Sequence, residues 1–452
     1  MLRKKTRIKN ENTKKRADLT EGSIYGQLTL LSVPLIFGNI LQQLYNTIDA
    51  VIIGRFAGAD EFAAVGVAGS IMNLFIFITA GLCDGFAILL AKKNGAADLG
   101  GFRRQHFAAF AEGLVFAAAL GAAGALAMGI IVDAVNTPGD VAHFVCSYMR
   151  IVMLSLPMTF LYNFYAAMLR SVGDTRAALV ILAAAVALNL VLDIIFVAAM
   201  GCGINGAAAA TALTQAASAV MCAAYVALRY GELMFRRSDS AVSADMLKST
   251  ARFGAVSALH HSGLYIGKLL VQGAVNTAGK DVIAAYTAAT RIEGFANSFG
   301  DSGAAASAAM IANNCGAGKT ARVKQIYRAA LLMLLCLGAA CALVMYAGAE
   351  PAVACMLGGG ASGVALASGA SYLRIVSLFY IFCFAGNALA GYFNGIGRVM
   401  ITFVGALGHI SIRVVISWLT IGSFGLPAVA AATGIGWVCV NIFWGALKRD
   451  RN

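Results

Sequence analysis

The chain has 452 residues, of which 60% are hydrophobic and only 12% charged, and its mean hydropathy is +0.78. A water-soluble domain carries about 25% charged residues, so this composition excludes a soluble globular protein. The net charge of +13 needs no nucleic-acid partner, because basic loops that set the orientation of a membrane protein account for it.

Residues 1–27 form a basic segment without the apolar core and small-residue cleavage site of a signal peptide, so we expect a cytosolic tail. Twelve apolar windows follow, separated by charged residues or by Gly and Pro, and a spanning helix needs about 20 such residues. The expected helices are 28–53, 61–90, 106–132, 141–168, 177–199, 205–228, 251–276, 282–311, 326–347, 365–394, 399–420 and 426–447.

The polar segment 229–250 divides these windows into two groups of six. The predicted fold class is therefore an all-α integral membrane protein with an N-lobe at 28–228 and a C-lobe at 251–447. Residues 448–452 are expected to form a cytosolic C-terminus.

The distribution of basic residues predicts the orientation. Most of the 34 Lys and Arg residues lie before the first window, after the even-numbered windows or after the last. The opposite side holds only Arg55 and Lys280. Because basic residues are retained in the cytoplasm, we expect a multi-pass protein of the cell inner (plasma) membrane with both termini cytoplasmic.

The two groups of windows share short identities. "SYMRIV" at 147 recurs as "SYLRIV" at 371, an offset of 224, and "AKKNGAA" at 91 aligns with "ANNCGAG" at 312, an offset of 221. Each group has an even number of windows, so the halves run in the same direction and form a parallel repeat. This architecture is typical of secondary transporters, which move one half against the other around a central site.

Several charged residues lie inside apolar windows, where each needs a partner or water. Arg150 and Arg374 are copies of one another, so a structural ion pair is favoured over a contact with substrate or a gate. In the eighth window we expect Arg291, Glu293 and Asp301 to form an internal salt-bridge network, with a substrate-facing Glu293 as the alternative.

Two acids of the first half have no acidic counterpart in the second half. Asp49, Asn189 and Asp193 have the repeat counterparts Leu270, Arg413 and Ser417. A requirement of the scaffold should have appeared in both halves, so the asymmetry favours a functional role.

The spacing of these polar residues predicts one site. Asn189 and Asp193 are four residues apart, as are Tyr45 and Asp49, so each pair shares a helix face. Thr211 is expected at the same depth. Carboxylate, amide and hydroxyl oxygens can bind a proton or Na⁺, so a Na⁺ site at Asp49, Asn189 and Asp193 is one hypothesis. The alternative is that each acid forms a cap or an ion pair near the interface.

The sequence resembles the multidrug and toxic compound extrusion (MATE) family over nearly its whole length. The resemblance is carried by "VPLIFGNILQQLYNTIDAVIIGRFAGADEFAAVG" (33–66), "AMLRSVGDTR" (167–176), "NLVLDIIFVAAMGCGINGAAAATALTQ" (189–215), "IANNCGAGK" (311–319) and "YFNGIGR" (392–398). It implies two lobes around a V-shaped cavity. It also implies antiport that exports amphipathic, often cationic compounds against an inward flow of Na⁺ or H⁺.

Individual positions match the family pattern. Asp49, Asn189, Asp193 and Thr211 match the first-lobe cation site of the DinF-like branch, and Pro34 matches the proline around which the first helix bends. NorM-like members carry acids in the seventh and tenth helices, which this sequence lacks. It is therefore closer to the DinF-like branch.

Other classes leave different signatures. A flippase for lipid-linked saccharides tends to have more helices and a cationic cavity, and it is the alternative function. An intramembrane enzyme needs a motif such as HExxH or GxSxG, which this sequence lacks. We expect no cofactor beyond the coupling ion, small amphipathic or cationic substrates and membrane lipid as partners, and a monomer.

Three further sets of residues remain without an assigned role. The aromatic residues include Phe164 and Phe379, which could line a substrate cavity or pack between helices. The seventh window contains His260, His261 and Lys268, for which packing or polar lining is the favoured interpretation. Asp84 is an acid that the resemblance does not explain.

Overall fold

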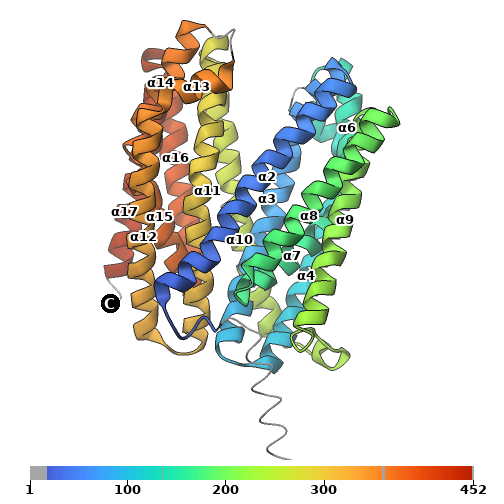
Figure 1. The fold of residues 1–452 in the computed structure, drawn as a ribbon, viewed down its shortest axis with the longest axis vertical. Helices are drawn as coiled ribbons and strands as arrows, with labels where there is room; N and C mark the ends of the chain where they lie inside the picture. The colour runs from blue at the N-terminus through green and yellow to red at the C-terminus, as the bar shows by residue number, and fades with distance from the viewer. Residues whose placement is uncertain (1–17, 136, 359–361, 450–452) are drawn as a thin grey trace, which may run out of the picture. The chain divides into compact units, whose positions relative to one another are not determined.

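The structure is a computed structural model that describes residues 18–135, 137–358 and 362–449 (Figure 1). Most of the expected N-terminal tail and the last residues of the expected C-terminus lie outside the described residues. The described chain consists of helices and their connections, without a strand. The all-α fold class is therefore confirmed.

Twelve long helical segments occupy the positions of the twelve expected windows, some with a shorter helix attached. They are α2 (Ile24–Phe56), α3 (Ala59–Gly95), α4 (Leu99–Leu126) with α5 (Met128–Ala134), α6 (Gly139–Leu154) with α7 (Leu156–Ser171), α8 (Thr175–Asp193) with the π-helix η1 (Ile194–Ala199), α9 (Gly203–Arg229), α10 (Ala244–Asn276), α11 (Lys280–Gly316), α12 (Thr320–Ala347) with α13 (Ala349–Leu357), α14 (Gly363–Ser377) with α15 (Tyr380–Gly395), α16 (Val399–Phe424) and α17 (Leu426–Arg449). A 3₁₀ turn, η2 (Arg237–Ser240), lies in the polar linker.

Eight of the described helices are individually long and apolar enough to cross a membrane, and two bent pairs raise this number to ten. Helices α10 and α11 have 33 and 37 residues, or about 50 Å and 55 Å at 1.5 Å per residue. They are long enough to span a membrane but less apolar than the others, because residues such as His260, Lys268 and Glu293 interrupt them.

The bent pairs occupy the same place in both repeats. The axes of α6 and α7 differ by 49°, and those of α14 and α15 by 52°. Pro157 lies at the start of α7, where its missing N–H breaks the hydrogen-bond ladder of a continuous helix. The shared bend supports the parallel duplication.

Contacts divide the chain into two compact units. The first is built around Val33–Ala258 and includes Asn313–Gly318. The second combines Ser23–Ser32, Leu259–Ala312 and the chain from Lys319 onward. These units differ from the expected lobes, 28–228 and 251–447, because the boundary lies inside α10 and two short segments are exchanged.

Two glycines at repeat-equivalent positions let the ends of α3 and α11 cross within the first unit. A Cβ added to Gly95 would overlap the carbonyl oxygen of Asn313, and a Cβ added to Gly316 would overlap that of Lys92. Asn94 Nδ2 also donates a hydrogen bond to Asn313 Oδ1 at 2.8 Å. The duplicated "NGAA" and "CGAG" segments therefore form one close backbone contact.

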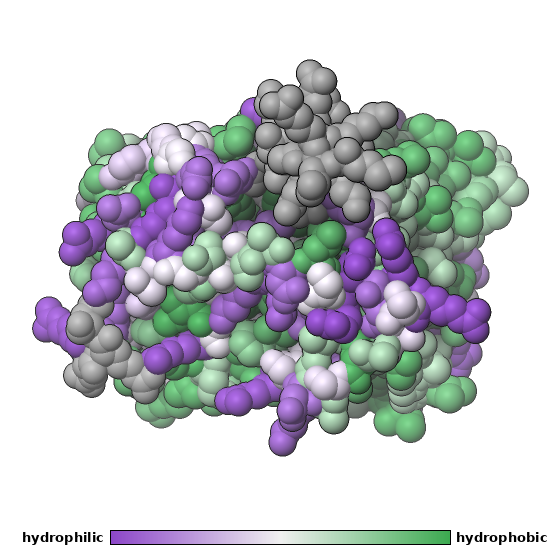
Figure 2. Space-filling model, turned by 90° about the horizontal axis from the view of Figure 1, so that it is seen from below, coloured by the Kyte–Doolittle hydropathy of each residue, from purple (hydrophilic) through white to green (hydrophobic). Residues whose placement is uncertain are grey.

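Figure 2 views one end of the molecule and shows hydrophilic residues gathered across it, with hydrophobic residues around the sides. Lys92 and Lys93 lie in the last turn of α3, and Arg103 and Arg104 lie near the start of α4. An apolar belt beside a charged end is the distribution that a bilayer-spanning protein needs.

Candidate functional site

The first unit brings together all five residues that the sequence nominated for a cation site. Tyr45 and Asp49 lie on α2, Asn189 and Asp193 on α8, and Thr211 on α9. Asn189 and Asp193 are 1% exposed and Thr211 is 7% exposed. Tyr45 and Asp49 are half-buried, and all five residues lie within a single unit.

The two carboxyl groups face one another across α2 and α8, so that each interacts directly with the other. The Tyr45 hydroxyl approaches Thr211 without reaching hydrogen-bond geometry. Two carboxylates in contact repel each other unless a proton or a cation lies between them.

Several polar atoms of this cluster have no hydrogen-bond partner among the described residues. They are both carboxylate oxygens of Asp193, Oδ1 of Asp49, Nδ2 of Asn189 and Oγ1 of Thr211. Buried polar atoms are nearly always paired in folded proteins. Orphaned oxygens at one buried place therefore fit a ligand that accepts electron pairs, which is a proton or a metal cation.

The chemistry of this donor set limits the cation. Within the described ranges no three His, Cys, Asp or Glu residues are grouped so as to hold a metal ion. The cluster instead offers two carboxylates with neutral amide and hydroxyl oxygens. Such oxygen ligands suit a hard cation rather than a transition metal.

Local structure explains how α8 and α9 present these side chains. The π-helix η1 begins directly after Asp193, and such widened turns occur frequently at functional sites. The backbone N–H of Ile204 donates to the carboxylate of Glu61, so an acid on α3 caps the start of α9. Ser147 Oγ donates to Asn205 Oδ1 at 2.6 Å and ties α6 to the same end.

Tyr148 on α6 belongs to the cluster but was missed by the sequence interpretation. It is 1% exposed and lies near Tyr45, Asp49 and Asp193. Its hydroxyl makes a weak contact with Met72 Sδ at 3.9 Å and also lies near Thr211. The repeated "SYMRIV" and "SYLRIV" carry the signal, because they duplicate the tyrosine as well as the arginine.

Pro34 lies inside α2, and the division between the two units passes between Ser32 and Val33. A proline within a helix removes one hydrogen bond and its ring crowds the preceding turn. The proline therefore lies next to the place where α2 passes from one unit to the other.

The network expected in the eighth window has different members in the structure. Glu293 accepts a hydrogen bond from Tyr372 Oη at 3.0 Å and lies near Arg413, not Arg291. Residues 291 and 293 are two apart, so they point to different faces of a helix. Asp301 lies near Lys268, so the expected Arg291–Glu293–Asp301 network is wrong.

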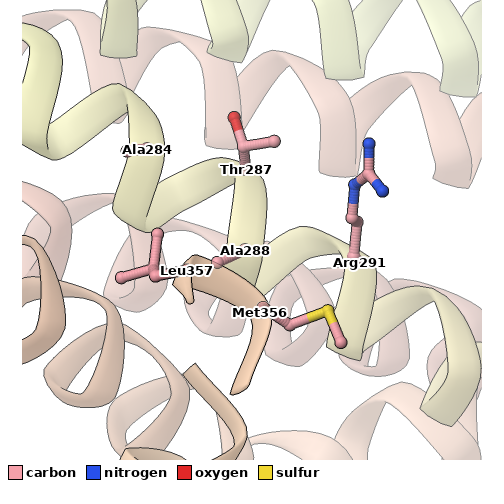
Figure 3. A pocket seen from close by; sticks show the side chains of 6 residues that line it. All are labelled: Ala284, Thr287, Ala288, Arg291, Met356 and Leu357. Carbon is pink, nitrogen blue, oxygen red and sulfur yellow. The ribbon is translucent and has the colours of Figure 1, made fainter. Parts of the chain in front are cut away.

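Arg291 instead lines a shallow groove of about 390 Å³ in the second unit (Figure 3). Thr287 and Arg291 project into it from α11, and Met356 and Leu357 border it from α13. The groove is mostly apolar apart from these two α11 side chains.

The duplicated arginines both lie at the surface of their units. Arg374 pairs with Glu350 at 3.3 Å, and their side chains are 46% and 59% exposed. Arg150 is exposed. The structural interpretation is favoured for Arg374, because its partner lies at the start of the neighbouring short helix α13.

The aromatic residues proposed for a cavity are packed. Phe164 is fully buried, with its ring centroid 5.5 Å from Phe160 and 5.4 Å from His106. Phe379 covers Gly434, where an added Cβ would overlap its ring. Phe164 therefore belongs to the hydrophobic core, which favours the packing alternative over a cavity.

The remaining polar residues of unknown role have local partners. Asp84 accepts a hydrogen bond from Arg170 Nη2 at 2.9 Å, so it is paired rather than only solvated. The rings of His260 and His261 are 5.7 Å apart and tilted, as adjacent residues of one helix are.

Two parallel repeats of spanning helices, with paired acids buried in one of them, define a multi-pass membrane transporter. The chain belongs to the MatE family, whose model matches residues 34–195 and again residues 257–419. The two matches fall on the two repeats, which confirms the duplication inferred from short identities.

Known relatives share much of the chain. The probable multidrug resistance protein YpnP of Bacillus subtilis is 28% identical over 314 residues, which cover 68% of this chain and 69% of YpnP. The probable multidrug resistance protein NorM of Thermotoga maritima is 21% identical over 437 residues, or 93% and 90% of the two chains. The placement in a DinF-like branch therefore stays a prediction.

Solved structures share the fold. A crystal structure of a MATE protein in complex with MaL6 superposes with a TM-score of 0.89 at 22% identity, covering 96% of this chain and 97% of that one. An outward-facing MATE transporter of the MOP superfamily has a TM-score of 0.86 at 24% identity, with the same coverage.

Proposed function

We propose that this protein exports amphipathic, often cationic compounds across the membrane by cation-coupled antiport. Its membership of the MatE family and its similarity to YpnP, a probable multidrug resistance protein, support export of such compounds. Alternating access of two repeated units supplies the route, since parallel repeats in transporters move against one another around a central site.

The observation that carries the coupling is the contact between Asp49 and Asp193, with orphaned oxygens around it. Asp49, Asp193 and Asn189 would hold Na⁺ through oxygen atoms, with the hydroxyls of Tyr45 and Thr211 completing the set. A proton shared by the two carboxyl groups would also relieve the repulsion between them. Either ion neutralises the cluster in one state of the cycle and leaves it charged in the other.

Pro34 gives α2 a place to bend when the ion binds. The helix carries Asp49 about 22 Å along its axis from Pro34, at 1.5 Å per residue. A change of charge at Asp49 would therefore act on α2, the helix that passes from one unit to the other near Pro34.

The remaining features of the proposal concern the setting of the protein. It would work as a monomer in the cell inner membrane with both termini cytoplasmic, and it would need no cofactor besides the coupling ion. Lipid and small substrates would be its only partners.

The test is gradient-driven dye efflux by purified protein in liposomes. Wild-type efflux of a cationic dye should collapse with the ionophore that dissipates the coupling gradient, either Na⁺ or H⁺. Asp49→Asn and Asp193→Asn keep the shape of the side chains and should abolish coupled efflux. Asp133→Asn, an exposed acid of the same unit, is the matched control and should transport as wild type does. Wild-type coupled rates in both acid variants would remove the acids from the mechanism.

A further inference from the structure

The second unit carries a basic residue where the first carries its buried polar cluster. The offset of 224 aligns Arg413 on α16 with Asn189 on α8, and Ser417 with Asp193. Ser417 is fully buried and its hydroxyl has no partner among the described residues. The first unit therefore has an acid, Asp193, where the second has the neutral Ser417. The second unit has the guanidinium of Arg413 one helical turn from that serine.

Arg413 belongs to a buried chain of contacts that ends on a carboxylate. Its Nη2 donates to Tyr286 Oη at 3.1 Å, and Tyr372 Oη donates to Glu293 Oε2 at 3.0 Å. The two tyrosine rings pack edge to face, with centroids 5.6 Å apart. Glu293 is 6% exposed, Tyr286 3% and Tyr372 0%.

A carboxylate buried in this way needs a positive charge near it, because an uncompensated charge in the interior is costly. Two positive charges act on Glu293, and the Arg413 guanidinium has a larger electrostatic effect than Lys268. Lys268 is exposed and lies near a second acid, Asp301. Arg413 is therefore the main counterion of Glu293.

We propose that Arg413 is a built-in cation of the second unit, standing at the counterpart of the cation site in the first unit. A guanidinium remains protonated under all physiological conditions, so it keeps a fixed positive charge in the network that holds Glu293. This fixed charge takes the place of an exchangeable Na⁺ in the second unit, and the coupling ion binds in the first unit alone. This inference rests on the proposed function and deepens it.

The first test is a stability cycle in the Asp49→Asn/Asp193→Asn background, so that the first-unit site does not contribute. Arg413→Asn installs the residue of the other repeat and should lower the unfolding temperature of purified protein in detergent. Adding Glu293→Gln should restore that temperature, because the pair is then neutral. The exposed pair of the same unit, tested as Arg374→Asn with and without Glu350→Gln, is the control and should show no such rescue.

The second test is gradient-driven dye efflux by the neutral pair Arg413→Asn/Glu293→Gln with both first-unit acids intact. Its efflux should match wild type in ion dependence, because Glu293 does not exchange an ion.

Failure of Glu293→Gln to restore stability overturns the proposal, and so does a folded neutral pair that has lost coupled efflux. If wild type itself shows no coupled efflux, the proposed function fails, yet the stability cycle still decides the role of Arg413.

Discussion

Tyr148 and Tyr372 occupy the same position in the two repeats, which allows one substitution to be made twice in different surroundings. Tyr148→Phe and Tyr372→Phe each remove one hydroxyl and keep the ring, and both tyrosines are buried at 1% exposure or less. Their hydroxyls face repeat-equivalent residues, Met72 and Glu293, with the same offset of 221 between them.

The expected losses of stability differ because the acceptors differ. Tyr372 donates to a carboxylate at 3.0 Å, and hydrogen bonds to charged groups contribute about 1.5–3 kcal/mol. Tyr148 has no carboxylate acceptor at this distance: it reaches a thioether sulfur at 3.9 Å, a weak acceptor worth well under about 1 kcal/mol, and lies near the neutral hydroxyl of Thr211. Tyr372→Phe should therefore destabilise the protein by about 1–2 kcal/mol more than Tyr148→Phe does.

The transport assay should give the opposite order. Tyr148 lies beside Asp49 and Asp193, so Tyr148→Phe should raise the concentration of coupling ion needed for half-maximal dye efflux. Tyr372→Phe should leave that concentration unchanged in the protein that remains folded. Equal losses of stability, or a shift in ion dependence in Tyr372→Phe alone, would refute the reasoning about both clusters.

Two further predictions concern the polar end of the first unit. Gly95→Ala should destabilise the protein by about 1–3 kcal/mol, because its Cβ would overlap Asn313. Gly69→Ala on the same helix meets nothing within 4 Å and should leave the unfolding temperature unchanged or raised. Asp98 caps α4 by accepting from Gly101 N–H at 2.8 Å, and this bond holds the pKa of Asp98 below its usual value, helped by Lys93. Asp98→Ala should cost about 1 kcal/mol. The difference from wild type should be full at neutral pH and should disappear as the pH falls below about 4, which thermal unfolding at several pH values would show.

The positions of the helices could be predicted because each spanning segment is a long apolar run between polar connections. The sequence predicts one helix over 141–168 and does not locate the bend between α6 and α7. Pro157 was a visible signal, but a proline also fits the first turn of a helix without any bend. The angle depends on packing within the unit, which hydropathy does not report.

The acids could be identified as a site because they break the repeat, and the structure places Asp49 beside Asp193. The partners of Glu293 could not be identified from the same sequence. Arg413 and Tyr372 lie on α16 and α14, more than 75 residues away along the chain. Periodicity shows which residues share a face of one helix, whereas this network depends on which helices pack against one another. Arg291, two residues from Glu293, was the nearest cation in sequence and points elsewhere.

The repeated hexamer shows what duplication preserves. Its tyrosine is buried in both units, whereas Arg150 and Arg374 are exposed. The tyrosine is therefore a packing residue that both units keep, whereas the charged residues around it differ between the units. Around Tyr148 the charged neighbours are two acids, Asp49 and Asp193. Around Tyr372 they are an acid and an arginine that compensate each other. On the proposed mechanism, a single scaffold position serves an exchangeable ion in one unit and a fixed arginine charge in the other, and this fixed charge spares the second unit from having to bind and release an ion in each cycle.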